Sequence, residues 1–401
     1  MVSPQGHHLP LVAIFTNCTM HNVQSQSLAY STDGGESWQM YEGNPVLTNP
    51  ELADFRDPKV FWDEQHQQWI MSLAVDQVIQ FYHSSDLKQW TLSSEFGRDL
   101  GAHGGVWECP DLFPLKVEGT GLQKWILLVS INPGGPNGGS ATQYFIGEFD
   151  GKHFRADHTE TLWMDYGPDN YAGVTWSDMP STDSRRILIG WMSNWEYAKD
   201  TPTAPWRGAM TFPRELGLQQ TEQGIRLTHQ PVGEIEHLFL GPSLHHQERK
   251  IINKDNLTEQ LCLPEHCQIK LHASWQNMAS SSWCMAFSST VGDQLKLTFS
   301  LKDNELIIDR SQVSHKINNA MFSNKIHIPI DLTHGIQLTL LKDTSSLELF
   351  ANDGKSLATL LYFSEEDLTQ LHLGINNPNV DFSLHNLEIQ PLCSIWHTKS
   401  E

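Results

Sequence analysis

One carboxylic acid in this sequence, Glu108, has apolar neighbours and is a candidate for proton transfer. Glu108 lies between Trp107 and Cys109, and Asp111 follows three positions later. Low-polarity surroundings and nearby negative charge both favour the protonated form of a carboxyl group. That form is the one that a general acid needs near neutral pH. The alternative interpretation is a Glu at the end of a strand, solvated and without a chemical role.

A second carboxylate stands in the motif Arg56-Asp57-Pro58. The positive charge of Arg56 would keep Asp57 ionised. An ionised carboxylate can accept hydrogen bonds from two adjacent hydroxyl groups, and such bonds can strengthen in a transition state. The alternative is a structural Arg-Asp pair at the corner of a sheet.

Short strands must position both motifs. Four apolar runs rich in β-branched or aromatic residues predict buried strands at residues 11–16, 69–75, 125–131 and 187–193. Each is followed by a second predicted strand, at residues 26–31, 78–84, 142–149 and 207–213. The last three apolar runs are also preceded by a predicted strand with an Asp or Pro corner, at residues 55–62, 107–113 and 174–180. This repeat of antiparallel strands predicts a β-propeller whose first unit has no leading strand.

The pattern changes after residue 216. Residues 231–240 predict a short helix, because a proline is tolerated in the first turn. Further on, short alternating strands are separated by turns, as at residues 295–301, 306–309, 336–341 and 347–350. Such spacing is typical of a β-sandwich. We therefore expect a propeller domain over residues 1–228, a linker with a short helix over residues 229–245, and a sandwich over residues 246–401.

The composition excludes several classes of partner. The chain has 26 Lys and Arg against 47 Asp and Glu, a formal net charge of -21. Such acidity argues against nucleic acid and anionic membranes, and it fits a neutral ligand such as a sugar. No apolar run is long enough to span a bilayer. The 6 cysteines include no C-x-x-C pair, so we expect no zinc site.

In their order and spacing, the two acidic motifs resemble those of glycoside hydrolase family 32, which contains levanases, invertases and other β-fructofuranosidases. The flanking sequence is similar to that of bacterial levanases at residues 24–30, 103–107, 190–195 and 213–216. Residues 347–354 resemble the family's C-terminal sandwich. The resemblance covers nearly the whole chain. It implies an all-β fold with a five-bladed β-propeller followed by a β-sandwich. Because we count four units, we expect about four blades, with the first blade missing.

The resemblance also implies roles for the motif residues. Glu108 matches the family's general acid/base, and Asp57 matches its transition-state stabiliser. Arg56 and Cys109 would contact the substrate beside them. A retaining glycosidase of this kind acts on β-fructosides such as levan, inulin or sucrose, releases terminal units, and needs no metal or organic cofactor. By analogy with the family we expect an extracellular or secreted protein, and the alternative is a cytoplasmic one.

Further candidates for substrate contact lie later in the chain. Asp165 and Tyr166 resemble a substrate-contacting loop, and the indole of Trp191 could form the floor of the sugar site. Asn194 is a weaker candidate in the same stretch. For each of these four residues, the alternative is ordinary packing in the core or at its rim.

One residue that the family requires is not found. Family members carry an Asn-Asp-Pro-Asn-Gly motif near the N-terminus, and its Asp is the nucleophile. The only Asp-Pro pair in this chain is Asp57-Pro58, and Asp54 has no motif support as a replacement. We therefore expect a truncated chain without hydrolytic activity, since the covalent step needs a carboxylate nucleophile. The alternatives are a non-catalytic fructan-binding or regulatory remnant and a partial gene model whose true start lies upstream.

Overall fold

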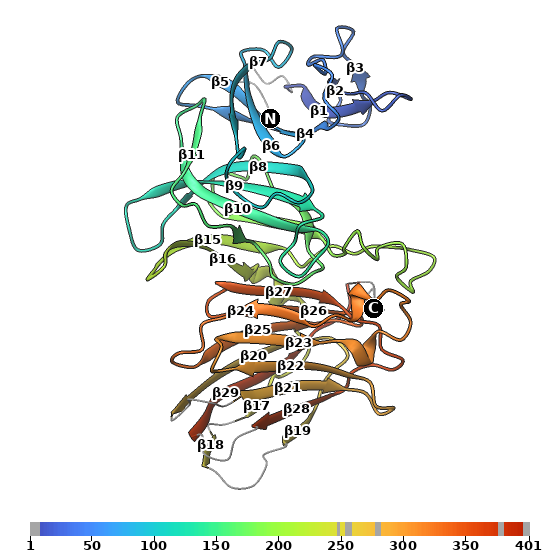
Figure 1. Ribbon diagram of the computed structural model, residues 1–401, viewed down its shortest axis with the longest axis vertical. Coiled ribbons are helices and arrows are strands. Elements are labelled where there is room, and N and C mark those ends of the chain that lie inside the picture. The colour runs from blue at the N-terminus through green and yellow to red at the C-terminus, as the bar shows by residue number, and fades with distance from the viewer. Residues whose placement is uncertain (1–8, 247–248, 253–258, 277–281, 376–380, 396–401) are drawn as a thin grey trace. The chain divides into compact units, whose positions relative to one another are not determined.

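The fold is built almost wholly from antiparallel strands (Figure 1). The computed structural model describes residues 9–246, 249–252, 259–276, 282–375 and 381–395. Within these residues the only helices are three short 3-10 helices, η1 (Gly233–Leu238), η2 (Ser311–Val313) and η3 (Met321–Ser323). None of the described helices is long and apolar enough to cross a lipid bilayer. The expectation of an all-β chain is confirmed.

Successive small sheets occupy the chain up to residue 231. The first sheet contains β1 (Leu11–Cys18), β2 (Gln24–Ser31) and β3 (Gln39–Met40). The second contains β4 (Phe55–Asp63), β5 (Gln68–Val75), β6 (Val78–Ser84) and β7 (Thr91–Phe96). The third contains β8 (Val106–Lys116), β9 (Gln123–Asn132), β10 (Ala141–Phe149), β11 (Phe154–Ala156) and β12 (Leu162–Trp163). There follow β13 (Tyr171–Thr175), β14 (Arg186–Trp191), β15 (Arg214–Thr221) and β16 (Gly224–Pro231).

Most of the predicted strands are confirmed, and two are wrong. The four apolar runs form β1, β5, β9 and β14, although no residue of β1 is buried, and the two motifs lie in β4 and β8 as expected. Residues 207–213 form no strand, because Gly208 has a φ of +79° and lies against the Trp191 indole, and a single bridge joins Trp191 to Met210. The third leading strand is β13, earlier than residues 174–180, where the left-handed φ of Asp178 and the missing N–H of Pro180 interrupt an extended strand.

The chain divides into two compact units. Unit 1 consists of residues 1–134, 142–163 and 172–179, and unit 2 consists of residues 135–141, 164–171 and 180–401. In unit 1, Phe55, Met71 and Leu73 of the second sheet pack with Ile14 of the first. Phe81 and Trp107 belong to a further cluster that joins the second sheet to the third. These buried apolar faces hold the motif-bearing strands β4 and β8 in place.

Unit 2 contains the expected β-sandwich. One sheet has the strand order β17-β29-β20-β25-β26-β27, with β18 also paired to β29, and the other has the order β19-β28-β21-β22-β23-β24. The strands are β17 (Leu244–His246), β18 (Arg249–Ile252), β19 (Glu259–Cys262), β20 (Cys267–Gln276), β21 (Ser282–Ser288), β22 (Gln294–Ser300), β23 (Glu305–Asp309), β24 (Ile326–Pro329), β25 (Ile336–Lys342), β26 (Ser346–Ala351), β27 (Ser356–Leu361), β28 (Gln370–Ile375) and β29 (Asp381–Pro391).

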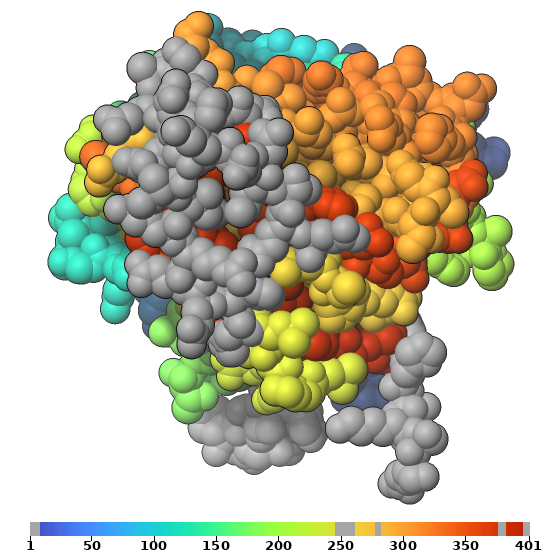
Figure 2. All heavy atoms as spheres, turned by 90° about the horizontal axis from the view of Figure 1, so that it is seen from below, coloured from blue at the N-terminus to red at the C-terminus, as the bar shows by residue number. Residues whose placement is uncertain are grey.

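Strict alternation explains why these residues form a sandwich. In β22, Leu295, Leu297 and Phe299 are buried while the residues between them face outward. Ile269 and Leu271 of β20 enter the same core from the other sheet. In Figure 2, red residues from late in the chain lie beside yellow and orange residues from earlier in the sequence, in agreement with the pairing of β29 with β20.

Candidate functional site

Both acidic motifs occupy β-bulges in the first strands of two successive sheets, β4 and β8. The pairing of β4 with β5 shifts between Arg56 and Lys59, and the pairing of β8 with β9 shifts between Glu108 and Asp111. At each bulge the second motif residue has a left-handed backbone, with a φ of +61° at Asp57 and +49° at Cys109. A proline follows in both cases, and the interrupted ladder tolerates its missing N–H. Left-handed backbone at a residue other than glycine costs about 1–2 kcal/mol and often marks a functional site.

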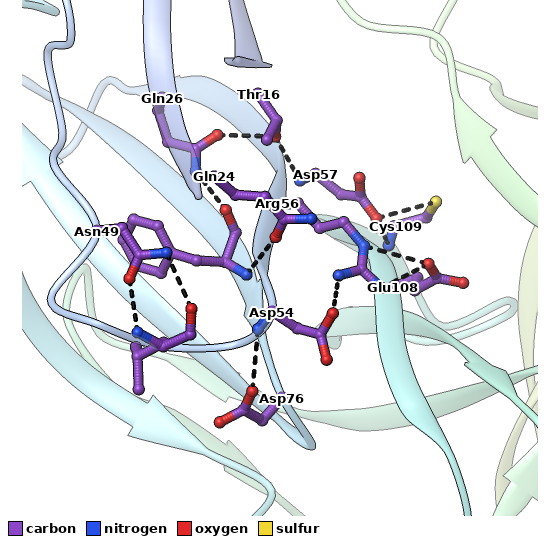
Figure 3. Close-up of polar contacts among 12 residues, drawn as sticks. Thr16, Gln24, Gln26, Asn49, Asp54, Arg56, Asp57, Asp76, Glu108 and Cys109 are labelled. Carbon is purple, nitrogen blue, oxygen red and sulfur yellow. Dashed lines mark hydrogen bonds and ion pairs between the residues drawn. The ribbon is translucent and has the colours of Figure 1, made fainter. Parts of the chain in front are cut away.

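The two bulges bring the motifs together (Figure 3). The backbone N–H of Cys109 donates to Oδ2 of Asp57 over 3.0 Å, and the Cys109 Sγ lies 3.6 Å from the same oxygen. Nε and Nη2 of Arg56 donate to Oε1 of Glu108 over 3.2 and 2.9 Å. Each motif therefore holds the other, and the two carboxylates lie on either side of the Cys109 peptide.

Arg56 does not pair with Asp57 as expected. Its guanidinium is shared between Glu108 and Asp54, whose carboxylate accepts a hydrogen bond from Nη1. Burial alone would lower the pKa of Arg56, but the hydrogen bonds to Asp54 and Glu108 outweigh it and raise that pKa. The side chains of Arg56, Glu108 and Asp54 remain 19%, 21% and 28% exposed, so a ligand could reach them from solvent.

The pKa of Asp57 is raised rather than lowered. Burial is the main cause, and the neighbouring charge of Glu108 adds to it, while the Cys109 N–H and the charge of Arg56 oppose the shift. The pKa of the Cys109 thiol is also raised, by burial and by the charges of Asp57 and Glu108. The thiol therefore stays protonated near neutral pH, which argues against Cys109 as a thiolate nucleophile.

Asp111, whose charge the sequence placed near Glu108, lies in the interior of unit 1 with partners of its own. It is 1% exposed, and its Oδ2 accepts hydrogen bonds from the backbone N–H and the hydroxyl of Thr175 over 2.7 and 2.8 Å. Lys59 Nζ lies 3.7 Å from the same oxygen. The Asp111 carboxylate thus pairs with a lysine from the other motif-bearing strand.

Residues from the first sheet support the motif strand and were not found by sequence reasoning. Thr16 Oγ1 accepts a hydrogen bond from the Asp57 N–H over 3.0 Å and donates to Gln26 Oε1 over 2.9 Å. Gln26 Nε2 donates to the Phe55 carbonyl, and Gln24 Oε1 accepts from the Phe55 N–H, each over 2.7 Å (Figure 3). Gln26 is wholly buried. Its sequence signals were its place in a predicted strand and in the stretch 24–30 that is similar to bacterial levanases.

Asp165 belongs to unit 2 and lies in its interior. It is 1% exposed, and Oδ2 is 2.9 Å from Nη1 of Arg214. Oδ1 accepts from the N–H groups of Gly167 and Thr359. Nη2 of the buried Arg214 pairs with Glu348 of β26 over 2.7 Å. Both carboxylate oxygens of Asp165 are therefore occupied by protein groups, which is the arrangement that a buried charge requires.

A second buried arginine lies nearby in unit 2. Nη1 of Arg310 is 2.7 Å from Oδ2 of Asp169, and its Nη2 is 3.0 Å from the hydroxyl of Tyr197. That hydroxyl donates to the other Asp169 oxygen over 2.6 Å. Segment 164–171 is thus joined to the sandwich by the buried ion pair of Asp169 with Arg310 and by the hydrogen bonds of Asp165 to Thr359.

Tyr166, Asn194 and Trp191 also belong to unit 2. Tyr166 packs against the sandwich core, and burial raises the pKa of its hydroxyl. Asn194 is 0% exposed, and its amide bonds the backbone of Ser140 and Pro168. Trp191 is half-buried and lies 5.0 Å, between ring centroids, from Trp195, which is 51% exposed. Of these three, Tyr166 and Trp191 are partly exposed and Asn194 is not.

No group of three or more His, Cys, Asp or Glu that could hold a metal ion occurs among the residues that the structure describes. The site consists of three carboxylates, those of Asp54, Asp57 and Glu108, together with a guanidinium and a backbone donor. Such a set can hold hydroxyl groups and transfer a proton.

Comparisons with known proteins match nearly the whole chain. Residues 2–231 match the family model "Glycosyl hydrolases family 32 N-terminal domain", and residues 234–391 match "Glycosyl hydrolases family 32 C terminal". The levanase of Bacillus subtilis is 41% identical over 410 residues, which cover 98% of this chain and 58% of the levanase. The extracellular exo-inulinase inuE of Aspergillus niger is 32% identical, over 94% of this chain and 76% of its own length.

A solved structure is similar as well. The fructofuranosidase from Schwanniomyces occidentalis complexed with fructose superposes with a TM-score of 0.84 and 30% identity. The match covers 96% of this chain and 79% of that chain.

Proposed function

Because this chain belongs to glycosyl hydrolase family 32, we propose that its motif site binds a terminal β-fructosyl unit of levan, inulin or sucrose. The observation that carries the proposal is the interlock of Asp57 with Cys109 and of Arg56 with Glu108. Two carboxylates and a guanidinium in one exposed cluster can hold the adjacent hydroxyls of a furanose ring. The relatives carry the names levanase and exo-inulinase, which fits this class of ligand.

We assign the chemical roles within this site as follows. Glu108 acts as the general acid/base of a retaining mechanism, and Asp57 stabilises the oxocarbenium-like transition state. Arg56 and the Cys109 thiol contact the sugar. The half-buried Trp191 belongs to unit 2, and we propose it by itself as a platform for a sugar ring. An extracellular location follows by analogy with the exo-inulinase.

We further propose that these 401 residues bind fructosides without turning them over. The sequence contains no Asn-Asp-Pro motif, so no carboxylate is assigned to the covalent step. The sheets before residue 231 then represent four blades of a five-bladed propeller, without the first blade. A non-catalytic fructan-binding role is the second candidate function, since the same cluster would hold a sugar without cleaving it.

The direct test measures binding and turnover on the same protein. We expect the chain to bind fructose in isothermal titration calorimetry and Asp57→Ala to weaken that binding about tenfold or more, because hydrogen bonds to a charged group contribute about 1.5–3 kcal/mol. Glu36→Ala removes an exposed carboxylate in a turn of the same unit and should leave binding unchanged.

Turnover is measured as fructose released from sucrose, levan and inulin. We expect rates lower than those of a complete enzyme by a factor on the order of 10⁴–10⁶, as is typical when a catalytic carboxylate or its partner is removed. Rapid fructose release by the chain would contradict the proposed loss of turnover. Fructose binding that is insensitive to Asp57→Ala would contradict the assigned site.

A further inference from the structure

A hollow with hydrogen-bonding walls lies on the outer face of the sandwich, apart from the motif site. It has a volume of about 280 Å³ and belongs wholly to unit 2. Its floor is formed by β20, β25 and β29, and one side is closed by Gln230 and the turn at Asp353-Gly354. This hollow lies on the opposite face of the sheet from the apolar core that contains Ile269 and Leu271.

Strand register arranges the floor into two rows of side chains. Lys270 is paired with Thr339 on one side and Glu388 on the other. Two residues further along β20, His272 is paired with Gln337 and Asn386. Neighbouring strands lie about 4.8 Å apart and alternate residues about 6.7 Å apart. The rows therefore present polar groups at spacings comparable to those of hydroxyls on one or two sugar rings.

The hollow is held in shape by side-chain hydrogen bonds to the backbone and by a close approach of the backbone at Gly354. The Asn352 side chain donates to the Asp331 carbonyl over 2.6 Å and accepts from the Gln337 N–H over 3.3 Å. Gly354 has a φ of +76°, and a Cβ there would lie only 1.8 Å from the His229 carbonyl oxygen. The turn at residues 352–354 thus fits closely against β16. A preformed hollow loses little entropy when a ligand binds.

The chemistry of the lining selects a neutral polyhydroxy ligand. Amides, an imidazole and a hydroxyl supply both donors and acceptors. The one ammonium, on Lys270, lies beside Glu388, so the hollow offers no net positive charge to an anion. The net charge of -21 further disfavours phosphates and nucleic acids. An apolar ligand would find no exposed apolar wall, because Phe350 is 2% exposed.

We propose that this hollow is a second, non-catalytic site that binds internal fructosyl units of a β-fructan chain. The proposal rests on the proposed function, because membership of a fructoside-cleaving family identifies the sugar. A site of this kind adds affinity for a polymer without any change in the affinity of the motif site for a single fructose unit, since internal units occur only in a chain. The expected ligand is therefore levan or inulin rather than sucrose.

The test compares matched pairs of substitutions. Lys270→Ala/Thr339→Ala removes one row of the hollow, and His272→Ala/Gln337→Ala removes most of the other. The control, Lys296→Ala/Thr298→Ala, removes the same residue types as the first pair from the outward face of β22 in the other sheet. Affinities for inulin, levan and fructose are measured by titration calorimetry, and thermal melting confirms that each variant is folded.

We expect each hollow variant to weaken inulin or levan binding about tenfold, the effect of removing two hydrogen bonds, while fructose affinity and the control remain unchanged. Asp57→Ala should weaken fructose binding instead. Polymer affinities equal to those of the unaltered chain in both hollow variants would overturn the inference, as would a failure of the unaltered chain to bind either polymer. Failure of the proposed function is distinct, because it appears as fructose binding that Asp57→Ala leaves unaltered.

Discussion

At the scale of single residues, the buried charge of Asp57 opposes stability. Because burial raises its pKa in the folded chain, the folded state binds the proton more tightly than the unfolded state does. The stability from this group is present below the ordinary pKa of 3.8 and is lost as the pH rises through the folded value. At pH 7 the ionised carboxylate is therefore destabilising.

We predict that Asp57→Asn raises the free energy of unfolding at pH 7 by up to about 1 kcal/mol. Asparagine tolerates the left-handed backbone and can still accept the Cys109 N–H. Urea denaturation at pH 7 and pH 4 measures the effect, which should shrink at pH 4. Asp86→Asn is the control of opposite sign, since backbone hydrogen bonds from Lys88 and Gln89 lower the pKa of Asp86. A loss of stability in Asp57→Asn at pH 7 would refute this account.

Because of His229, we expect the stability of the fold to fall in acid. This histidine is buried, and burial together with the charge of Arg214 lowers its pKa to about 3 from an ordinary value of 6.5. The unfolded chain therefore takes up a proton below pH 6.5 while the folded chain does not, so stability is complete above pH 6.5 and falls as the pH drops toward 3. We expect a contribution of up to about 1.4 kcal/mol per pH unit in this window.

The measurement is the slope of unfolding free energy against pH in the unaltered chain and in His229→Gln. Glutamine does not titrate, so this part of the slope should disappear whatever the variant's absolute stability. Equal slopes between pH 6.5 and pH 4 in the two proteins would rule out this role for His229.

At the scale of elements, segment 164–171 depends on a close backbone approach to β27. A Cβ on Gly167 would lie 2.2 Å from both the N and the O of Thr359. We predict that Gly167→Ala destabilises unit 2 by several kcal/mol, because the clash is with backbone and the buried Asp165 bonds the same strand. Gly121→Ala is the control, since a Cβ at Gly121 meets nothing within 4 Å. Thermal melting would show a large drop for the first variant alone, and equal melting temperatures would contradict the prediction.

Much of the fold follows from the sequence because its strands are short and strongly patterned. The run 78–84 was predicted with the bounds that β6 has. Residues 207–213 looked like a strand, but the contact of Gly208 with the Trp191 indole depends on tertiary structure. Local composition cannot report such a contact.

The sequence predicted which residues form the candidate site, but not which hydrogen bonds and ion pairs those residues make. Glu108 and Asp57 were found from their motifs, and the structure places them in one cluster. The pairing of Arg56 with Glu108 joins positions 52 residues apart, so adjacency in sequence favoured Asp57 instead. Asp165 illustrates the reverse difficulty. Its resemblance to a substrate-contacting loop suggested a sugar contact, whereas its partners Arg214 and Thr359 lie 49 and 194 residues away.

At the scale of the whole molecule, we expect self-association through one edge of strand β1. One edge of β1 pairs with β2 over its full length, and no strand pairs with its other edge within the residues that the structure describes. The strand contains no charged residue or proline, and Leu11 and Val12 are exposed. Such edges readily pair with another chain.

We expect light scattering to show concentration-dependent association or low solubility of the 401-residue chain. Val12→Lys should reduce it, because a charge on the edge blocks pairing. Val291→Lys adds the same charge at an exposed valine of the sandwich and should have little effect. A sharply melting monomer at all concentrations would contradict the prediction.

The buried arginines also decide where this protein can be divided. The two family models meet between residues 231 and 234, which suggests a natural point for dissecting the gene. A fragment that begins there would keep Glu348 and Arg310 but lose their partners Arg214 and Asp169. Each orphaned interior charge would cost about 3–5 kcal/mol. The sandwich is therefore not a detachable module, and a gene fusion that borrows its sugar-holding face must also carry the stretch from Asp165 to Arg214.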